Sequence, residues 1–337
     1  MMRVSAGVIR RQDGRILICK RGEGRKNAHL WEFPGGKQEA GETAADCLQR
    51  EIREELLMQV CPGEMLFTEE KEGILFDFVA AVTDETPTLT EHEAMAWVTP
   101  REMLHYSFCP ADTDVALRMA LQDPPLTNFL WDFDGTLMDT YPAMVQAVIR
   151  AAAKQGMHPC TEQVTTWMMH DLRYCLHQIA TAGHADEEQL YRDYRQEEAL
   201  IPPDQVSMMP GMEALLEALH QRGGRHFLVT HRGKDAWSYL THAGVSQLFA
   251  GGITREAGLP RKPAPDMLLR VMEDFHLAPE QTIMIGDRPL DTEAGQRAGI
   301  LSCMLDTSGR FREGHADLYA GNAAELMAIL CPKDLHL

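Results

Sequence analysis

The chain has 337 residues, more than one hydrophobic core usually holds, and a typical domain of about 150 residues predicts two domains. Hydrophobic residues make up 45% and charged residues 24% of the sequence, which is ordinary for a globular protein and excludes a fibrous or disordered chain. The formal net charge of −18 argues against a nucleic-acid partner and favours small phosphorylated molecules, bound through local cations or metal ions.

The sequence contains no signal for a membrane or for secretion. No apolar run approaches the roughly 20 residues of a membrane span, and the first residues lack the long apolar core of a secretory signal. We therefore expect a cytoplasmic protein. The eight cysteines contain no C-x-x-C pair and lie mostly in apolar surroundings, which predicts buried free thiols that serve packing.

The first part of the chain predicts an α+β domain at residues 1–123. Strand-like segments at 3–9, 16–19 and 74–82 surround one strongly helical stretch at 43–57. A short linker at 124–127, which contains two prolines, then separates this domain from the rest of the chain.

Three glutamates in this helical stretch are candidate metal ligands. Glu51, Glu54 and Glu55 are three and four residues apart, so a helix projects them from one face. Like charges so close together need a neutralising partner, and hard oxygen ligands are what Mg²⁺ prefers. For an isolated E-x-x-E-E, the alternative is a solvated acidic helix face.

The spacing around this helix resembles the signature of the Nudix hydrolases. It runs from Gly36 through five residues to Glu42, then through seven residues to Arg50-Glu51-Ile52, one residue, and Glu54-Glu55. The resemblance implies Mg²⁺, or Mn²⁺ in its place, bound by Gly36, Glu51, Glu54 and Glu55, with Glu51 and Glu54 catalytic and Gly36 also contacting substrate. The family pattern ends with a glycine where this chain has Leu57, and glycine at that point usually caps the helix.

The segment 30–37, LWEFPGGK, resembles the MutT-like branch, which acts on nucleoside triphosphates. In that resemblance Glu91 is a further metal-binding glutamate and Arg21 is a phosphate contact. Asp112 lies where MutT-like proteins place an amide or carboxylate against the base, which leaves an oxidised guanine and a cytosine-type base open. Its alternative role is to cap the helix predicted at 113–121. The implied products are a nucleoside monophosphate and pyrophosphate.

After the linker, short apolar runs alternate with helical ones, a pattern that predicts a parallel sheet wound with helices. Asp132 and Asp134 follow the strand-like segment 129–131, Thr230 follows 226–229, and Asp287 follows 282–286. The carboxyl ends of such strands are where ligands bind. Each element alone is weak, because D-x-D-G also marks tight turns and calcium loops.

Together with Lys262 and Asp291, these residues resemble the four motifs of the haloacid dehalogenase superfamily over residues 128–332. That resemblance implies an α/β Rossmann-like fold with an α-helical cap inserted at about 143–207. Asp132 is then the nucleophile that forms an aspartyl-phosphate, and Asp134 the acid and base, which favours phosphatase or phosphomutase chemistry over dehalogenation. The remaining implied roles are phosphoryl binding by Thr230 and Lys262, and Mg²⁺ binding by Asp132, the backbone carbonyl of Asp134, Asp287 and Asp291.

Two features of this second part have no fixed role. His231 follows Thr230 where the family often has a small asparagine or an arginine. In the cap region, His170, Arg173 and His177 are candidates to face the leaving group, with surface or packing roles as the alternative.

The sequence thus predicts a bifunctional hydrolase in which the first domain cuts a nucleoside triphosphate and the second removes the remaining phosphate. One alternative is that one domain has become a nucleotide-sensing module. Another pairs a nucleoside diphosphate derivative as the first substrate with an unrelated sugar phosphate as the second. The sequence leaves the oligomeric state open.

Overall fold

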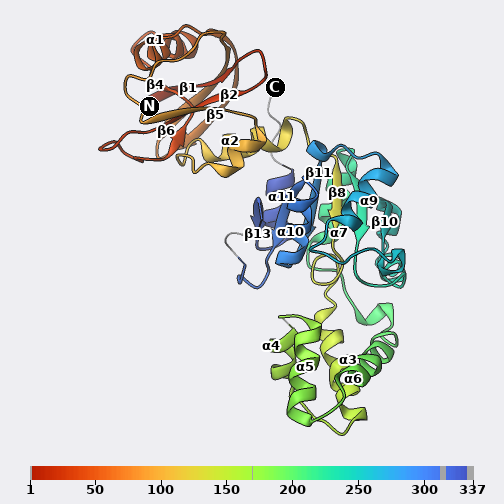
Figure 1. Cartoon of the computed structure of the whole chain (residues 1–337). Helices are drawn as coiled ribbons and strands as arrows, with labels where there is room; N and C mark the ends of the chain where they lie inside the picture. The colour runs from red at the N-terminus through yellow and green to blue at the C-terminus, as the bar shows by residue number, and fades with distance from the viewer. Residues whose placement is uncertain (1, 169, 312–315, 332–337) are drawn as a thin grey trace. The chain divides into compact units, whose positions relative to one another are not determined.

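A computed structural model of the chain describes residues 2–168, 170–311 and 316–331. These residues form two compact units, one up to Pro125 and the other at Leu126–Cys331 (Figure 1). None of the helices in the described ranges is long and apolar enough to cross a membrane.

The first unit is a mixed sheet with two main helices, as expected for the α+β domain. Its sheet order is β3-β2-β1-β6-β5, with β4 paired to β1 and β7 paired to β2. Its elements are β1 (Met2–Arg10), β2 (Ile16–Lys20), β3 (Trp31–Glu32), β4 (Gly35–Lys37), α1 (Ala44–Leu56), β5 (Cys61–Lys71), β6 (Ile74–Val82), β7 (Ala94–Val98) and α2 (Thr113–Gln122).

The alternation of apolar side chains along the strands gives this sheet two buried faces. Ile9, Leu17 and Val79 pack with Leu48 and Ile52 of α1 in one core cluster. Their strand neighbours, Val8, Ile16, Ile18 and Phe78, pack with Val115 and Met119 of α2 in a second cluster. Because successive strand residues point to opposite faces, α1 and α2 cover opposite sides of the sheet, as Figure 1 shows.

Helix α1, which carries the three glutamates, has defined ends. Thr43 caps its N-terminus in a reciprocal capping box with Asp46. Its C-terminus ends at Leu57, whose backbone lies in the left-handed region at φ 51° and ψ 33°. Leu57 therefore adopts the conformation that a glycine C-cap normally supplies, and its side chain is exposed.

The second unit contains a six-stranded parallel sheet in the order β10-β9-β8-β11-β12-β13, as the alternating pattern predicts. Its strands are β8 (Asn128–Trp131), β9 (Arg225–Val229), β10 (Phe249–Ile253), β11 (Thr282–Gly286), β12 (Leu301–Leu305) and β13 (Leu318–Ala320). Its flanking helices are α7 (Met212–Gln221), α8 (Ala236–His242), α9 (Asp266–Phe275), α10 (Pro289–Arg297) and α11 (Ala323–Leu330).

The strand order brings the predicted motifs together. Strand β8 lies between β9 and β11, so the residues that follow these three strands share one edge of the sheet. Below that edge, Leu130, Phe227 and Met284 pack against Leu268 and Val271 of α9 in a buried cluster. The central strands are apolar on both faces because helices cover both sides of a parallel sheet.

Four helices are inserted between β8 and α7. They are α3 (Tyr141–Lys154), α4 (Thr161–Met168), α5 (Leu172–Gly183) and α6 (Glu187–Glu198). Consecutive helices of the insert pack together, and α3 also packs against α6, around the buried side chains of Val148, Val164, Leu176, Leu190 and Tyr194. This is the helical insert that the sequence predicts.

All eight cysteines are free thiols. Cys19, Cys47, Cys109, Cys175 and Cys303 are buried, in agreement with a packing role. Cys61 and Cys160 are exposed, so packing does not account for these two.

Candidate active sites

A cavity of about 630 Å³ in the first unit contains most of the side chains predicted for the Nudix site. Six of those residues line it: Arg21, Gly36, Glu51, Glu55, Glu91 and Asp112. Further cationic side chains on its wall are those of Arg25, Lys26, Lys37 and Lys71. The wall thus mixes cationic with acidic side chains, which suits an anionic ligand bound together with metal cations.

Glu54 is not part of the cavity lining. Its side chain is 61% exposed and lies 3.6 Å from Nη1 of Arg50. On a helix, residue 54 lies about 100° from residue 55, with residue 51 between them, so only part of the acidic face can point into one cavity. The structure thus brings Glu51 and Glu55 to the cavity and leaves Glu54 at its outer side.

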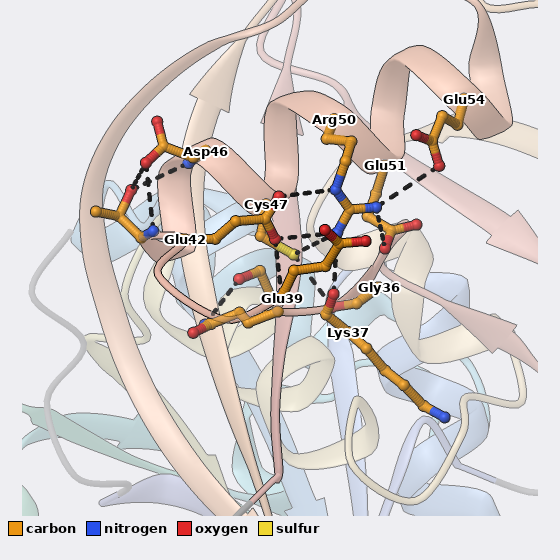
Figure 2. Close-up of polar contacts among 12 residues, drawn as sticks. Gly36, Lys37, Glu39, Glu42, Asp46, Cys47, Arg50, Glu51 and Glu54 are labelled. Carbon is orange, nitrogen blue, oxygen red and sulfur yellow. Dashed lines mark hydrogen bonds and ion pairs between the residues drawn. The ribbon is translucent and has the colours of Figure 1, made fainter.

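Arg50 organises the acidic helix (Figure 2). Its guanidinium donates to Glu42 and Glu51 at 2.8 Å and to the carbonyl oxygen of Lys37 at 3.0 Å. The hydrogen bond from Arg50 lowers the pKa of Glu42 to about 2, so this carboxylate is a permanent anchor for the arginine. The motif arginine therefore ties α1 to the loop that precedes it.

Gly36 leaves room for the end of the Glu51 side chain beside strand β4. A Cβ atom at residue 36 would lie 2.2 Å from Cδ of Glu51. The glycine carbonyl accepts a hydrogen bond from Sγ of Cys47 at 3.5 Å, on the same helix. The absence of a side chain thus lets the Glu51 carboxylate lie against the backbone, as a shared metal site for Gly36 and Glu51 requires.

Glu55 is buried, and its Oε2 has no hydrogen-bond partner. Burial raises the pKa of Glu55 to about 7, and the nearby Glu51 adds to this rise. An uncompensated buried carboxylate oxygen at a cavity wall is unfavourable by itself. A divalent cation supplies the missing partner, so Glu55, Glu51 and Gly36 fit a Mg²⁺ site.

Arg21 and Glu91 are both held by ion pairs at the cavity wall. Nη1 of Arg21 lies 2.5 Å from Oε2 of Glu32, and Arg25 pairs with Glu91. The sequence reasoning did not select Glu32, although it lies within the segment LWEFPGGK, or Arg25, which belongs to no motif.

Asp112 precedes helix α2 but does not cap it. Its side chain makes no capping hydrogen bond and instead accepts the backbone N–H of Phe33 at 3.0 Å. Asp112 is 6% exposed, and burial raises its pKa to about 8. The capping alternative is therefore wrong, and a buried carboxyl with a raised pKa lines the cavity.

The second unit contains a tight acidic cluster at the carboxyl edge of its sheet. Asp132, Asp287 and Asp291 each offer an oxygen within 4.8 Å of the others, the only such group of three or more potential ligands among the described residues. Burial and the adjacent Asp291 raise the pKa of Asp132, and Lys262 opposes this rise. Oδ2 of Asp132 has no hydrogen-bond partner, so the cluster fits a divalent cation.

Lys262 is fully buried between the acidic side chains. Its Nζ lies 2.5 Å from Oδ1 of Asp132 and 2.5 Å from Oδ1 of Asp291, and it donates to the carbonyl of Val229 at 3.0 Å. The backbone N–H of Lys262 donates to Nε2 of His231 at 2.8 Å. Burial lowers the pKa of His231 to about 3, so its ring stays neutral and serves to position the lysine.

The Asp287 carboxylate is held in place by Tyr141 and by the turn at Gly135. Tyr141, the first residue of α3, donates its hydroxyl to Oδ2 of Asp287 at 2.8 Å. Gly135 has φ +78°, and a Cβ atom there would lie 2.4 Å from Oδ2 of Asp287. The glycine of the D-x-D-G motif therefore supplies both a left-handed turn and the space for this carboxylate.

Asp134 and Thr230 lie beside the acidic cluster. Arg232 contacts Oδ1 of Asp134 through Nε and Nη2 at 3.2 Å each, and its backbone N–H donates to Oγ1 of Thr230 at 3.0 Å. The same guanidinium lies 3.7 Å from Oε1 of Glu198, the last residue of α6. The sequence reasoning missed Arg232, although its position two residues after Thr230 was the available signal.

A second cavity, of about 610 Å³, lies between the helical insert and the edge of the sheet. Trp167, His170 and Tyr174 contribute from the insert, and Arg288 and Phe311 contribute from the other side. Of the three candidate cap residues, only His170 lines this cavity, where its ring stacks on Tyr174 at 4.4 Å.

The other two candidate cap residues interact within the insert. Arg173 pairs with Glu188 at 2.9 Å, and His177 contacts Glu187 at 2.9 Å. These contacts agree with the surface and packing roles given as the alternative.

Comparison with known proteins assigns both parts of the chain to families. The family described as NUDIX domain matches residues 1–118, and the family described as Haloacid dehalogenase-like hydrolase matches residues 129–305. A CTP pyrophosphohydrolase of Escherichia coli (strain K12) is 39% identical over 117 residues, which are 33% of this chain and 86% of that protein.

The second part is similar to phosphatases. A phosphoglycolate phosphatase of Cereibacter sphaeroides is 28% identical over 198 residues, which are 56% of this chain and 89% of that protein. A solved structure described as "a predicted phosphoglycolate phosphatase" from Haemophilus somnus 129pt matches with a TM-score of 0.52 and 20% identity, covering 60% of this chain and 97% of that one. The chain therefore belongs to two hydrolase families, as a fusion of an N-terminal Nudix domain with a C-terminal haloacid dehalogenase-like hydrolase domain.

Proposed function

We propose that the chain is a bifunctional enzyme: the Nudix domain hydrolyses a cytosine nucleoside triphosphate to the monophosphate and pyrophosphate, and the second domain dephosphorylates that monophosphate. The domains correspond to residues 1–123 and 128–332, joined by a linker at 124–127. The observation that carries this proposal is that one chain holds a cavity lined by a buried carboxyl with a raised pKa and, in its second unit, both an aspartate cluster and a cavity with aromatic walls.

The choice of base rests on Asp112. A protonated carboxyl offers one donor and one acceptor, whereas an ionised carboxylate only accepts hydrogen bonds. The edge of cytosine presents the acceptor N3 beside the donor N4–H₂, which complements the protonated form. The edge of guanine presents two donors and complements the ionised form. The similarity to a CTP pyrophosphohydrolase supports cytosine over adenine, which also presents one donor and one acceptor.

The proposed metal and triphosphate ligands line the first cavity, except Glu54, which lies at its outer side and is included because it belongs to the Nudix motif. We assign Gly36, Glu51, Glu54, Glu55 and Glu91 to Mg²⁺, or to Mn²⁺ in its place, with Glu51 and Glu54 catalytic. Arg21 contacts the phosphate chain. When bound, the cation neutralises charge that develops on the phosphate oxygens. The orphaned Oε2 of Glu55 supports this assignment.

The phosphatase step uses residues at the sheet edge. Asp132 attacks the phosphorus atom, and the leaving alcohol takes a proton from Asp134, so an aspartyl-phosphate forms on Asp132. Asp134 then accepts a proton from the water molecule that hydrolyses the aspartyl-phosphate. Thr230 and Lys262 bind the phosphoryl oxygens, and Asp287 and Asp291 complete the Mg²⁺ site with Asp132 and the carbonyl of Asp134. Arg232 holds the Asp134 carboxylate in place.

The second cavity supports a nucleoside as the leaving group. Trp167, Tyr174 and Phe311 give it aromatic walls, and aromatic side chains stack on nucleobases with about 1–3 kcal/mol per base. A volume of about 610 Å³ is also larger than a two-carbon acid requires. Both observations favour a nucleoside monophosphate as substrate.

A second candidate substrate is a small phosphorylated acid. Arg288 lines the same cavity, its Nε is buried without a partner, and Arg310 is a further cation there. A carboxylate on the leaving group would pair with these guanidinium groups. The similarity to phosphoglycolate phosphatases supports this alternative.

Replacement of Trp167 separates the two candidates. We expect Trp167→Ala to lower kcat/KM for CMP by about 10- to 100-fold, because a stacking contact of about 1–3 kcal/mol is lost. The rate with phosphoglycolate should change little. Steady-state phosphate release measures both. Tyr191→Ala, which removes an insert ring that packs under Arg173 outside the cavity, is the control. A selective loss with phosphoglycolate would favour the small acid.

A further inference from the structure

His92 is a buried histidine of the Nudix domain whose side chain is 4% exposed. It follows the proposed metal ligand Glu91 in the chain but does not line the cavity. Its Nε2 lies 3.2 Å from Oε1 of Glu32 and 4.0 Å from Oε2 of Glu55. One ring nitrogen therefore stands between two carboxylates that belong to different walls of the cavity.

The surroundings of the two ring nitrogens fix the tautomer. Carboxylate oxygens accept hydrogen bonds, so the Nε2 that faces Glu32 carries a hydrogen and donates it. Nδ1 is buried and has no partner. A hydrogen on Nδ1 would be an unsatisfied buried donor, which is unfavourable, so Nδ1 carries the lone pair. His92 is thus a fixed Nε2–H donor.

The contact continues from Glu32 to the phosphate side of the cavity. While Oε1 of Glu32 accepts from His92, its Oε2 lies 2.5 Å from Nη1 of Arg21. Arg21 is held at a second point, because its Nε donates to the carbonyl of Lys26 at 2.8 Å. Arg21, Glu32, His92 and Glu55 therefore form one row from the proposed phosphate contact to the proposed metal ligand.

We infer that His92 is a positioning residue of the Nudix domain: its Nε2–H separates Glu32 from Glu55 and holds Glu32 so that Glu32 orients Arg21. Without this hydrogen bond, the two carboxylates lose the donor between them, and Glu32 is free to turn. Arg21 then loses its alignment toward the phosphate chain. The inference rests on the proposed function for the identity of the triphosphate and for Arg21 as its phosphate contact.

A pair of substitutions tests whether the donor, and not the bulk of the ring, is what counts. His92→Leu fills the site without a donor, and His92→Gln places an amide N–H near the position of Nε2. We expect His92→Leu to raise KM for CTP about tenfold, the loss of one hydrogen bond to a charged group, and His92→Gln to restore most of it. Equal KM values for the two variants would contradict the inference. Thermal unfolding confirms that both variants are folded.

A double-mutant cycle tests the connection to Arg21. If His92 acts through Glu32 on Arg21, then Arg21→Gln abolishes its effect, and the double variant raises KM no more than the worse single variant. Arg15→Gln is the control, because Arg15 pairs with Glu102 at 2.9 Å and does not line the cavity. We expect the effects of Arg15→Gln and His92→Leu on KM to multiply in the double variant. If the effects of Arg21→Gln and His92→Leu on KM multiply as well, the inference is overturned.

An NMR measurement of the His92 tautomer tests the inference without depending on activity. In ¹⁵N spectra of the histidine rings of the full chain, the signal that disappears in His92→Gln belongs to His92. We expect the pattern of a ring with its hydrogen on Nε2. A hydrogen on Nδ1 would contradict the inference even in an active enzyme. If CTP is not a substrate but the tautomer is as expected, the proposed function fails and the position of His92 stands.

Discussion

Asp112 shows how burial changes the chemistry that one carboxyl group offers. Because its pKa is about 8, it is protonated below that pH and ionised above it. Below pH 8 the group donates and accepts, and above pH 8 it only accepts. Discrimination between bases by this residue therefore depends on pH in a range where proteins are ordinarily assayed.

We predict that kcat/KM for CTP falls as pH rises through about 8, because the deprotonated Asp112 cannot donate to N3 of cytosine. Asp112→Asn keeps one donor and one acceptor and does not titrate, so its profile should lack this step. Initial rates from pH 6.5 to 9.5 for both proteins measure the difference. A step of equal size in the two profiles would show that another group is responsible.

Leu57 is a local conflict between a residue and its backbone conformation. A non-glycine residue in the left-handed region destabilises the folded state by about 1–2 kcal/mol. Glycine avoids this strain, but its greater freedom in the unfolded chain offsets part of the gain. We expect Leu57→Gly to stabilise the Nudix domain by about 0.5–1 kcal/mol. Denaturant unfolding measures the change. Arg53→Gly, at an exposed position within the same helix, should instead destabilise by about 1 kcal/mol.

Prediction from the sequence was weakest for residues that act through distant partners. His92 and Glu32 are 60 positions apart in the chain, much farther than the residues of a local motif. Only the fold brings Nε2 of His92 to 3.2 Å from Oε1 of Glu32. Arg232 contacts Asp134 across 98 positions. Conversely, Glu54 belongs to a motif, but its exposure depends on how α1 is rotated against the sheet, which spacing alone does not specify.

At the scale of elements, the meeting of β4 and α1 determines the geometry of the Nudix site. Gly36 allows the Glu51 carboxylate to lie against the strand, and Arg50 ties the same helix to the carbonyl of Lys37. The two contacts fix the helix at its acidic end. Any group added at residue 36 must therefore displace either the strand or the glutamate.

We predict that Gly36→Ala lowers kcat for triphosphate hydrolysis by about 100-fold, the cost of a displacement of about 1 Å in a catalytic group. Gly63→Ala is the matched control, because a Cβ atom there would make only an ordinary 3.5 Å contact with the carbonyl of Ala80. Activity and folding of both variants should be compared. Normal activity in Gly36→Ala would show that Glu51 does not need this close approach.

Elements with regular patterns were predictable, and irregular ones were not. Strands β1, β6, β8 and β11 and helix α1 lie where the sequence predicts them, because their apolar positions follow period 2, a continuous run or period 3.6. Strand β5, Cys61–Lys71, was not predicted. It lies at the edge of its sheet and shifts register twice between Pro62 and Phe67, which breaks the alternation that marks a strand.

At the scale of the whole molecule, two hydrolase domains share one chain, and each has its own cavity and acidic residues. If the domains act in sequence, the product of the first is the substrate of the second. This order requires the second domain to accept the monophosphate that the first releases. It also requires that each activity can be removed without loss of the other.

The most direct test is product chromatography of CTP incubated with Mg²⁺ and the full chain. We predict that the wild type yields cytidine, that Asp132→Asn stops at CMP, and that Glu51→Gln leaves CTP intact but still converts added CMP to cytidine. If the wild type itself stops at CMP, the two domains serve different substrates and the sequential account is wrong.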